Sequence, residues 1–272
     1  MHSRPNFLGG HPLTLKQLSE DSFRNICLIA TDMDGTLTTR GKFSASLLKA
    51  LEDLAAVGIK VLIVTGRSAG WMSGLSNLLP IVGAIAENGG LFYPSGNDQP
   101  VTLTAIPDLE AHRRNLSVAF KELKTKFPQI QESADNRFRV TDWTFDVADL
   151  SPEELEILSS LCQEMGWGFT YSNVQCHIKP QGQDKAVGLL QVLREYLPEF
   201  SSEQVLTVGD SPNDESLFNQ DHFSISVGVA NVLKYVNQLQ HQPTYMTTAA
   251  EGEGFCELCR YILPSREIQH KI

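Results

Sequence analysis

Two aspartates, Asp32 and Asp34, follow a short apolar run and are separated by a single residue. In an extended chain, this spacing places both carboxylates on the same side. Carboxylates held so close repel each other, and a hard divalent cation that accepts oxygen ligands from both removes the repulsion. The alternative is structural, with one aspartate capping a helix and the other lying in a turn.

A second pair of acids, Asp210 and Asp214, follows another apolar run, in the stretch Gly-Asp-Ser-Pro-Asn-Asp at 209–214. Helix capping would use one of these polar side chains but not all of them. Both pairs in one crevice would place four negative charges together, which requires a bound cation. The combination predicts a Mg²⁺ site. The expected metal ligands are Asp32, Asp34, Asp210 and Asp214.

Three further residues indicate a bound anion. Thr65 and Gly66 end an apolar run just before a predicted helix, where a hydroxyl and free amides favour phosphate. Helix capping by Thr65 or Ser68 is the alternative. Lys185 lies in the first turn of another predicted helix, where the helix dipole disfavours a cation. A bound phosphate explains that position, and a solvated lysine beside Asp184 is the alternative.

The elements that must position these residues form an α/β pattern. Five apolar, β-branched runs are typical of strands buried on both faces of a parallel sheet. Amphipathic helices are expected at 44–58, 68–80 and 184–197. We therefore predict a doubly wound, mostly parallel Rossmann-like sheet, in which ligands bind at the carboxyl ends of the strands. The predicted strands are 26–31, 59–65, 81–87, 205–209 and 223–229.

The middle of the chain has a different pattern, which indicates an inserted α+β domain. Helices are expected at 109–127 and 152–165, and strands at 137–147 and 168–179. The predicted organisation is an N-terminal arm at 1–25, a discontinuous core domain at 26–90 and 184–272, and an inserted domain at 91–183.

Composition limits the partners. The 22 basic and 32 acidic residues give a net charge of −10, which argues against nucleic acid and anionic membranes. The first residues lead into no apolar stretch typical of a secretory signal, and no segment is long enough to span a membrane. Five scattered cysteines suit a reducing compartment, so a cytoplasmic location is expected. We interpret Cys256 and Cys259 as a packed helical turn rather than a zinc site.

In order, these motifs resemble those of the haloacid dehalogenase (HAD) superfamily of phosphohydrolases. The third strand end (Glu87-Asn88-Gly89-Gly90) and the position of the insert resemble its IIB-like subfamily, in which a C2-type cap covers the site. The tail motif Gly228-Val229-Ala230-Asn231 is also similar. The four ordered motifs are Asp32-x-Asp34-Gly35-Thr36, Thr65-Gly66-Arg67, Lys185 and Gly209-Asp210-Ser211-Pro212-Asn213-Asp214.

The resemblance implies a role for each motif residue. Asp32 would be the nucleophile that forms an aspartyl-phosphate, and Asp34 the general acid and then the base. Mg²⁺ would be held by the Asp32 carboxylate, the Asp34 main-chain carbonyl and Asp210, with Asp214 in support. The implied phosphate-binding residues are Thr65, Gly66, Lys185 and Asn213.

The inserted domain would act as a lid that contacts the leaving group. Its aromatic residues could stack on a sugar ring or form its core, and its cations could meet a second anionic group or be solvated. The aromatic residues are Trp143, Phe145, Trp167, Phe169 and Tyr171. The cations are Arg137, Arg139, His177 and Lys179.

The sequence thus predicts a Mg²⁺-dependent phosphohydrolase for a small phosphorylated metabolite, with sugar phosphates favoured, and leaves the oligomeric state open. A phosphomutase on the same scaffold and a non-catalytic sugar-phosphate-binding protein are alternatives. A third alternative is a glycosyltransferase in which Asp32 and Asp34 form the metal site for a nucleotide-sugar. Intact Asp32, Asp34, Lys185 and Asp210 favour catalysis over binding alone, and the order of the motifs weighs against a glycosyltransferase.

Overall fold

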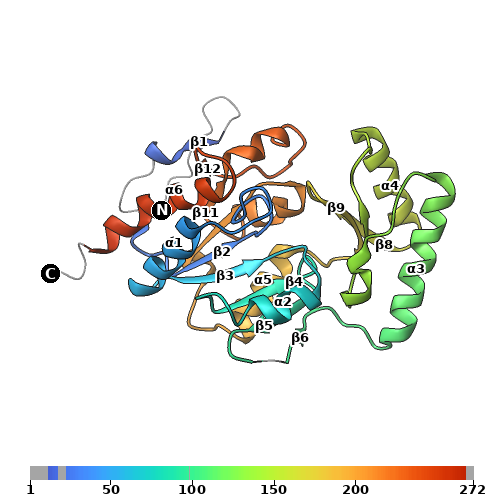
Figure 1. The fold of residues 1–272 in the computed structure, drawn as a ribbon, viewed down its shortest axis with the longest axis horizontal. Coiled ribbons are helices and arrows are strands. Elements are labelled where there is room, and N and C mark those ends of the chain that lie inside the picture. Colours follow the sequence, from blue (N-terminus) through green and yellow to red (C-terminus); the bar gives the residue numbers. More distant parts are fainter. Residues whose placement is uncertain (1–11, 18–22, 98, 268–272) are drawn as a thin grey trace.

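The computed structural model describes residues 12–17, 23–97 and 99–267. Within them, a large sheet with helices on both faces lies beside a smaller unit of strands and helices (Figure 1). The chain leaves the large sheet after β6 (Val101–Thr102) and returns to it in α5 (Lys185–Glu195). This is the mixed α/β fold with a mostly parallel sheet that the sequence predicts.

The large sheet has nine strands in the described residues, in the order β1-β12-β11-β10-β2-β3-β4-β5-β6. Neighbouring strands run parallel, except that β5 is antiparallel to β4 and β6. Every residue of β2, β4 and β10 is buried, as expected of apolar runs covered on both faces. The bounds are β1 Leu13–Thr14, β2 Leu28–Thr31, β3 Lys60–Val64, β4 Gly83–Ala86, β5 Leu91–Pro94, β6 Val101–Thr102, β10 Val205–Gly209, β11 Ile225–Gly228 and β12 Tyr245–Met246.

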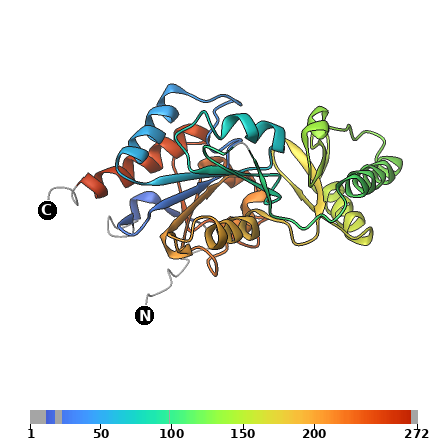
Figure 2. The same cartoon turned by 90° about the horizontal axis from the view of Figure 1, so that it is seen from below.

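Helices cover both faces of this sheet. Figure 2 shows α1 (Ala45–Ala56) and α6 (Glu251–Glu267) on one face and α5 on the other. The helix α2 (Ala69–Leu75) buries Met72 in the same apolar cluster as α1 and α6. Cys256 and Cys259 of α6 are also buried in that cluster, packed as the sequence suggests. The short 3₁₀ helices are η1 Leu15–Gln17, η3 Ala134–Phe138, η4 Ser202–Gln204, η5 Pro212–Phe218 and η6 Ala230–Lys234.

The ends of α1 follow from its sequence. The Ser44 side chain accepts a hydrogen bond of 3.1 Å from the Leu47 amide, so it caps the helix as predicted. After Ala56 the chain turns at Gly58, whose φ of +81° is easily adopted only by glycine. None of the helices in the described residues has the length and apolarity that a membrane span requires.

The smaller unit has its own core. Its antiparallel sheet, in the order β7-β9-β8, packs against α3 and α4. Phe145 is fully buried there, and Trp143, Trp167, Phe169 and Tyr171 are partly buried against the same cluster, which confirms the core interpretation of these aromatic residues. The bounds are α3 Leu109–Lys126, β7 Trp143–Asp146, α4 Pro152–Glu164, β8 Trp167–Tyr171 and β9 Gln175–Pro180.

Two strand predictions in this unit were wrong in extent. The expected strand at 137–147 is extended only at β7, because residues 134–138 form the 3₁₀ helix η3. The expected strand at 168–179 is two strands, β8 and β9, joined by a turn at 172–174. Ser172 makes that turn by accepting hydrogen bonds from the amides of Val174 and Gln175, at 3.1 and 3.3 Å.

The boundaries of the large sheet also differ from expectation. The inserted domain was expected from residue 91, but β5 and β6 still pair within the large sheet, because the turn after β4 lets the chain fold back as a hairpin. In the expected arm, β1 is an edge strand and Leu15 and Phe23 are buried in the core. Residues 1–11 and 18–22 of the arm lie outside the described residues. The division into domains otherwise stays a prediction.

Candidate active site

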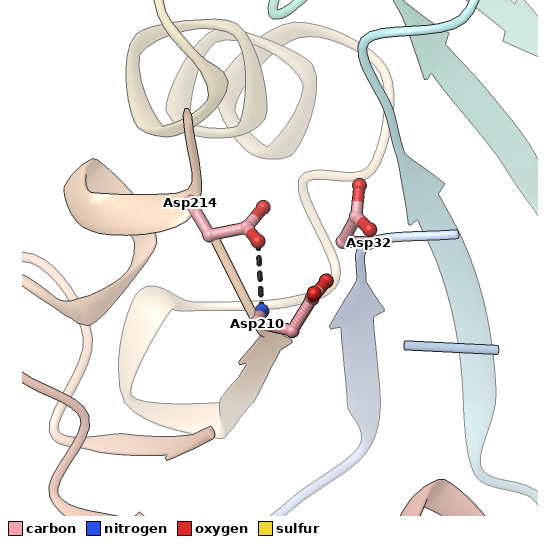
Figure 3. A group of neighbouring side chains, drawn as sticks. All are labelled: Asp32, Asp210 and Asp214. Carbon is pink, nitrogen blue, oxygen red and sulfur yellow. Dashed lines mark hydrogen bonds between the residues drawn. The ribbon is translucent and has the colours of Figure 1, made fainter. Parts of the chain in front are cut away.

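Three carboxylates meet at the carboxyl ends of neighbouring strands. Asp32 follows β2, Asp210 follows β10, and Asp214 lies in the helix η5 just after it. One oxygen of each lies within 4.8 Å of the other two, and all three residues are buried (Figure 3). The structure thus brings together three of the four acids for which the sequence predicts metal binding.

Lys185, the first residue of α5, binds two of these acids. Its Nζ donates hydrogen bonds of 2.6 Å to Oδ1 of Asp32 and to Oδ1 of Asp214. The lysine is completely buried, so the alternative of a solvated lysine is wrong. The Asp184 side chain instead caps α5 by accepting a hydrogen bond from the Val187 amide.

Asp210 and Asp214 are fixed by donors from other segments. Oδ1 of Asp210 accepts from Thr36 Oγ1 at 2.9 Å, and its Oδ2 accepts from Asn231 Nδ2 at 2.7 Å. Oδ2 of Asp214 accepts from the amides of Asp210 and Ser211, at 2.8 and 3.0 Å. The carboxylates are therefore held in place by the protein itself.

The charge of this cluster is incompletely balanced. Burial raises the pKa of Asp32 to about 7, with Lys185 acting in the opposite sense. Burial and the neighbouring Asp32 also raise the pKa of Asp210 well above its ordinary value. Burial alone would lower the pKa of Lys185, but Asp214 and Asp32 together raise it. Three buried carboxylates facing one lysine form an oxygen-rich, anionic group that fits a hard divalent cation.

The Asp34 carboxylate lies outside that group. Both of its oxygens accept hydrogen bonds of 2.7 Å from Arg67, one from Nε and one from Nη2. Metal binding through the Asp34 main-chain carbonyl, as the resemblance implies, stays a prediction. Arg67 belongs to the Thr65-Gly66-Arg67 motif, but its pairing with Asp34 could not be predicted from the sequence.

Beside the acids lies a cleft with about 310 Å³ of empty space. Its walls include Asp32, Asp34 and three of the four predicted phosphate-binding residues: Thr65, Gly66 and Asn213. The buried Thr65 hydroxyl accepts a hydrogen bond of 3.1 Å from the Arg67 amide. Asn213 donates one of 3.0 Å to Oδ1 of Asn88. The cleft thus places hydroxyl and amide groups beside the Asp32 carboxylate.

The inserted unit closes the opposite wall of the cleft. This wall is formed by the turn between β8 and β9 and by β9 itself. Its residues are Ser172, Val174, Gln175 and His177. Except for His177, these residues could not be predicted from the sequence, because no local pattern marks which turn of an inserted unit faces the site.

The other three cations, for which the sequence leaves both an anionic group and solvent open, do not line the cleft. Arg139 is buried and binds both oxygens of Asp142 at 2.9 and 3.0 Å. Lys179 is buried and donates to the main-chain carbonyl of Gln183. Arg137 is exposed and stacks on the Phe138 ring. Arg139 and Lys179 are therefore neither solvated nor part of the cleft wall, because Asp135 and Asp142 pair with Arg139 and the Gln183 carbonyl accepts from Lys179.

Glu87 joins the two units at the end of β4. Its carboxylate accepts hydrogen bonds from the amides of Val140 and Thr141 in the inserted unit and from the Ala69 amide of α2. Glu87 has a φ of +53°, a conformation that costs a non-glycine residue energy and that surrounding contacts must maintain. The sequence places Glu87 in a motif, but it does not show that the Glu87 carboxylate connects the large unit with the inserted unit.

Comparison with known proteins agrees with this geometry. The sequence matches the family of haloacid dehalogenase-like hydrolases over residues 29–113 and 110–250. A phosphoglycolate phosphatase of Methanothermobacter thermautotrophicus is 30% identical over 237 residues, which cover 85% of this chain and 96% of that protein. A phosphoglycolate phosphatase of Nitrosopumilus maritimus is 26% identical over 251 residues, covering 86% and 95%.

Solved structures share the fold. The crystal structure of Thermoplasma acidophilum 0175 superposes with a TM-score of 0.71 at 21% identity, covering 88% of this chain and 99% of that one. The C-terminal domain of trehalose-6-phosphate phosphatase from C. albicans gives 0.69 at 16% identity, covering 93% and 98%. The chain therefore belongs to the family of haloacid dehalogenase-like hydrolases, as one of its phosphatases.

Proposed function

We propose that this phosphatase is Mg²⁺-dependent and hydrolyses the monoester of a small phosphorylated metabolite, with sugar phosphates as the favoured class. One observation carries the proposal: Asp32 lines the cleft, and Nζ of the buried Lys185 donates hydrogen bonds to both Asp32 and Asp214. A carboxylate held by a buried lysine, beside further carboxylates that suit a cation, is equipped to attack a phosphate ester.

The proposed chemistry uses two carboxylates in succession. An Asp32 oxygen bonds to phosphorus as the bond from phosphorus to the ester oxygen breaks, and Asp34 gives a proton to the departing alkoxide. Asp34 then takes a proton from water, whose oxygen attacks phosphorus, so that phosphate leaves and Asp32 is restored. When bound, Mg²⁺ would neutralise charge on the transferring group, held by Asp32, Asp210 and the Asp34 carbonyl, with Asp214 in support.

Donors around the cleft would hold the phosphoryl oxygens. We assign this role to the Thr65 hydroxyl, the Gly66 amide, Lys185 and Asn213. All four residues come from the carboxyl ends of strands or from the helices that follow them, where ligands bind in α/β folds. Such fixed donors stabilise the charge that develops during transfer.

The walls of the cleft support a small leaving group, because residues of the inserted unit close the side opposite Asp32. The relatives reported above carry the name phosphoglycolate phosphatase, so phosphoglycolate belongs among the test substrates. We further propose a cytoplasmic location, consistent with five free thiols, and no nucleic-acid partner, consistent with the net charge of −10.

The test is phosphate release from a panel of sugar phosphates, polyol phosphates, phosphoglycolate, phosphoglycerates and nucleotides, with Mg²⁺ and with a chelator. We expect Mg²⁺-dependent release that falls roughly a thousandfold or more in Asp32→Asn. Glu52→Gln, at an exposed position of α1, is the control and should retain full activity.

The other outcomes are distinct. If no ester is hydrolysed and Asp32→Asn behaves like the wild type, the proposed activity is wrong. Isomerised substrate without free phosphate indicates a phosphomutase. Hydrolysis of phosphoglycolate alone assigns the substrate of the named relatives instead of a sugar phosphate.

A further inference from the structure

His177 is a titratable residue of the cleft that the proposed chemistry does not use. It lies on β9 of the inserted unit and lines the cleft together with Asp32 and Gly66. Only 1% of its surface is exposed. A buried imidazole on the wall opposite the nucleophile must either be a packing residue or contact what binds there.

The partner of one ring nitrogen fixes the ring. Nδ1 of His177 lies 2.7 Å from Oδ2 of Asp142. Burial alone would raise the pKa of Asp142, but Arg139 and His177 hold it below its ordinary value, so this carboxylate is ionised and can only accept a hydrogen bond. Nδ1 therefore carries the proton, which leaves Nε2 as an acceptor whenever the ring is neutral.

The ring is held against the proposed phosphate-binding loop. A Cβ placed on Gly66 would lie 3.1 Å from Cε1 of His177, so the imidazole packs directly on the Gly66 backbone. Arg139 reinforces this arrangement, because its Nη1 donates at 2.9 Å both to Oδ1 of Asp142 and to the Gly66 carbonyl oxygen. The hydrogen bond to Asp142 and the contact with Gly66 therefore fix the imidazole ring relative to the proposed phosphoryl site.

The second nitrogen has no protein partner. No described residue forms a hydrogen bond with Nε2. Nε2 is also not one of the fully buried, unpartnered polar atoms of the described residues, so the protein does not enclose it completely. Since Cε1, the neighbouring ring atom, faces Gly66 and the residue lines the cleft, Nε2 is the ring nitrogen available to a ligand.

We propose that His177 is a specificity-determining residue whose Nε2 accepts a hydrogen bond from a hydroxyl group on the leaving group, with Asp142 as the positioning residue. The inference rests on the proposed phosphatase activity and adds the chemistry of the substrate to it: a leaving group that carries a hydroxyl close to the ester, as in a sugar or polyol phosphate.

The charges of the cleft favour a hydroxyl over a carboxylate. Burial lowers the pKa of His177, although Asp142 acts in the opposite sense, so the ring is neutral near pH 7. Among the described residues that line the cleft, Arg67 is the one permanent cation, and both oxygens of Asp34 already bind it. A carboxylate on the leaving group would thus find no unpaired cation there, whereas a hydroxyl finds an acceptor.

The test compares matched esters that differ only in hydroxyl groups close to the ester, namely glycerol 3-phosphate against n-propyl phosphate and 2-hydroxyethyl phosphate against ethyl phosphate. The full-length wild type should hydrolyse the hydroxylated member of at least one pair with about tenfold higher kcat/KM. His177→Asn keeps a donor at the position of Nδ1 but no atom at the position of Nε2, and it should abolish that preference. His177→Gln reaches the position of Nε2 with an amide oxygen and should retain it.

The expected change in His177→Asn is selective, with kcat/KM falling about tenfold more for the hydroxylated ester than for its partner. A merely structural role would lower both equally, and equal loss or no loss overturns the proposal. If the variants do not fold, the wild type still decides, since equal rates within both pairs overturn it. A wild type that hydrolyses no ester at all contradicts the proposed function as well.

Discussion

Arg67 donates two parallel hydrogen bonds to the Asp34 carboxylate, each 2.7 Å long. Charge-assisted hydrogen bonds in this fork geometry are about twice as strong as hydrogen bonds between neutral groups. The guanidinium also stacks on the Trp71 ring, with Cζ 4.7 Å from its centroid. Because Asp34 is the proposed proton donor and acceptor, Arg67 fixes the direction in which that carboxylate points and is a positioning residue for the proton transfer.

Replacing Arg67 by Met should therefore affect poor leaving groups most. We expect kcat for an alkyl phosphate to fall by about 10–100-fold, because the alkoxide needs a well-placed proton donor. p-Nitrophenyl phosphate needs little protonation and should lose less than about threefold. Arg114→Met, on the exposed surface of α3, is the control. Equal losses for the two esters would contradict a role in proton transfer.

A second prediction concerns the buried Lys185. Lys185→Met leaves Asp32 and Asp214 without their cation in a buried site. Breaking a buried ion pair costs about 3–5 kcal/mol, so we expect a comparable drop in the free energy of unfolding, measured in urea with a chelator present. Lys49→Met, whose side chain is 67% exposed, should change it by less than about 1 kcal/mol. If Lys185→Met changes the free energy of unfolding only slightly, Asp32 and Asp214 are already protonated in the folded protein.

A third prediction concerns the metal. Ligands that bind only the folded state raise the melting temperature, so Mg²⁺ should raise the Tm of the wild type. Asp210→Asn keeps the shape of the side chain but weakens the anionic group, and the rise should be mostly lost. Asp221→Asn, at an exposed position, should retain the full rise. An unchanged rise in Asp210→Asn would place the cation elsewhere.

Glu87→Gln tests the junction between the two units. The Glu87 carboxylate meets only donors, from the amides of Ala69, Val140 and Thr141 and the Thr141 hydroxyl. A glutamine would turn an amide group toward some of these donors, and we expect a loss of about 1–3 kcal/mol in unfolding free energy. Glu156→Gln, exposed on α4, is the control. Unchanged stability would show that the carboxylate is already protonated.

The predictable part of the site lies where strands end. Asp32, Thr65 and Asp210 each follow an apolar run, and parallel pairing of those runs aligns their carboxyl ends at one edge of the sheet. Residue type and position along the chain were therefore enough to predict that these side chains converge. The hydrophobic pattern predicts the sheet for the same reason, because strands buried on both faces must be apolar throughout.

The rest depends on tertiary contacts that leave no local pattern. His177 lies on β9 of the inserted unit and reaches Gly66 only through the packing of that unit against the large one. Arg139 looks like a solvated cation in the sequence, whereas Asp142 and Asp135 neutralise it inside the protein. Likewise, the antiparallel pairing of β5 depends on a turn whose direction hydrophobicity does not encode.

A last prediction concerns pH. Burial raises the pKa of Asp32 to about 7, against an ordinary value of 3.8. Between these values the folded protein keeps a proton that the unfolded chain has lost, so the free energy of unfolding falls as pH rises from about 4 to about 7.

Urea unfolding of the metal-free protein across this range should thus show stability declining by on the order of 4 kcal/mol in the wild type. Asp32→Asn cannot ionise, so its decline should be smaller. Some decline should remain, because burial also raises the pKa of Glu87 to about 7. Mg²⁺ binds the ionised carboxylate and should oppose the decline in the wild type but not in the variant. Parallel pH profiles for the two metal-free proteins would show that Asp32 is ionised throughout, held so by Lys185.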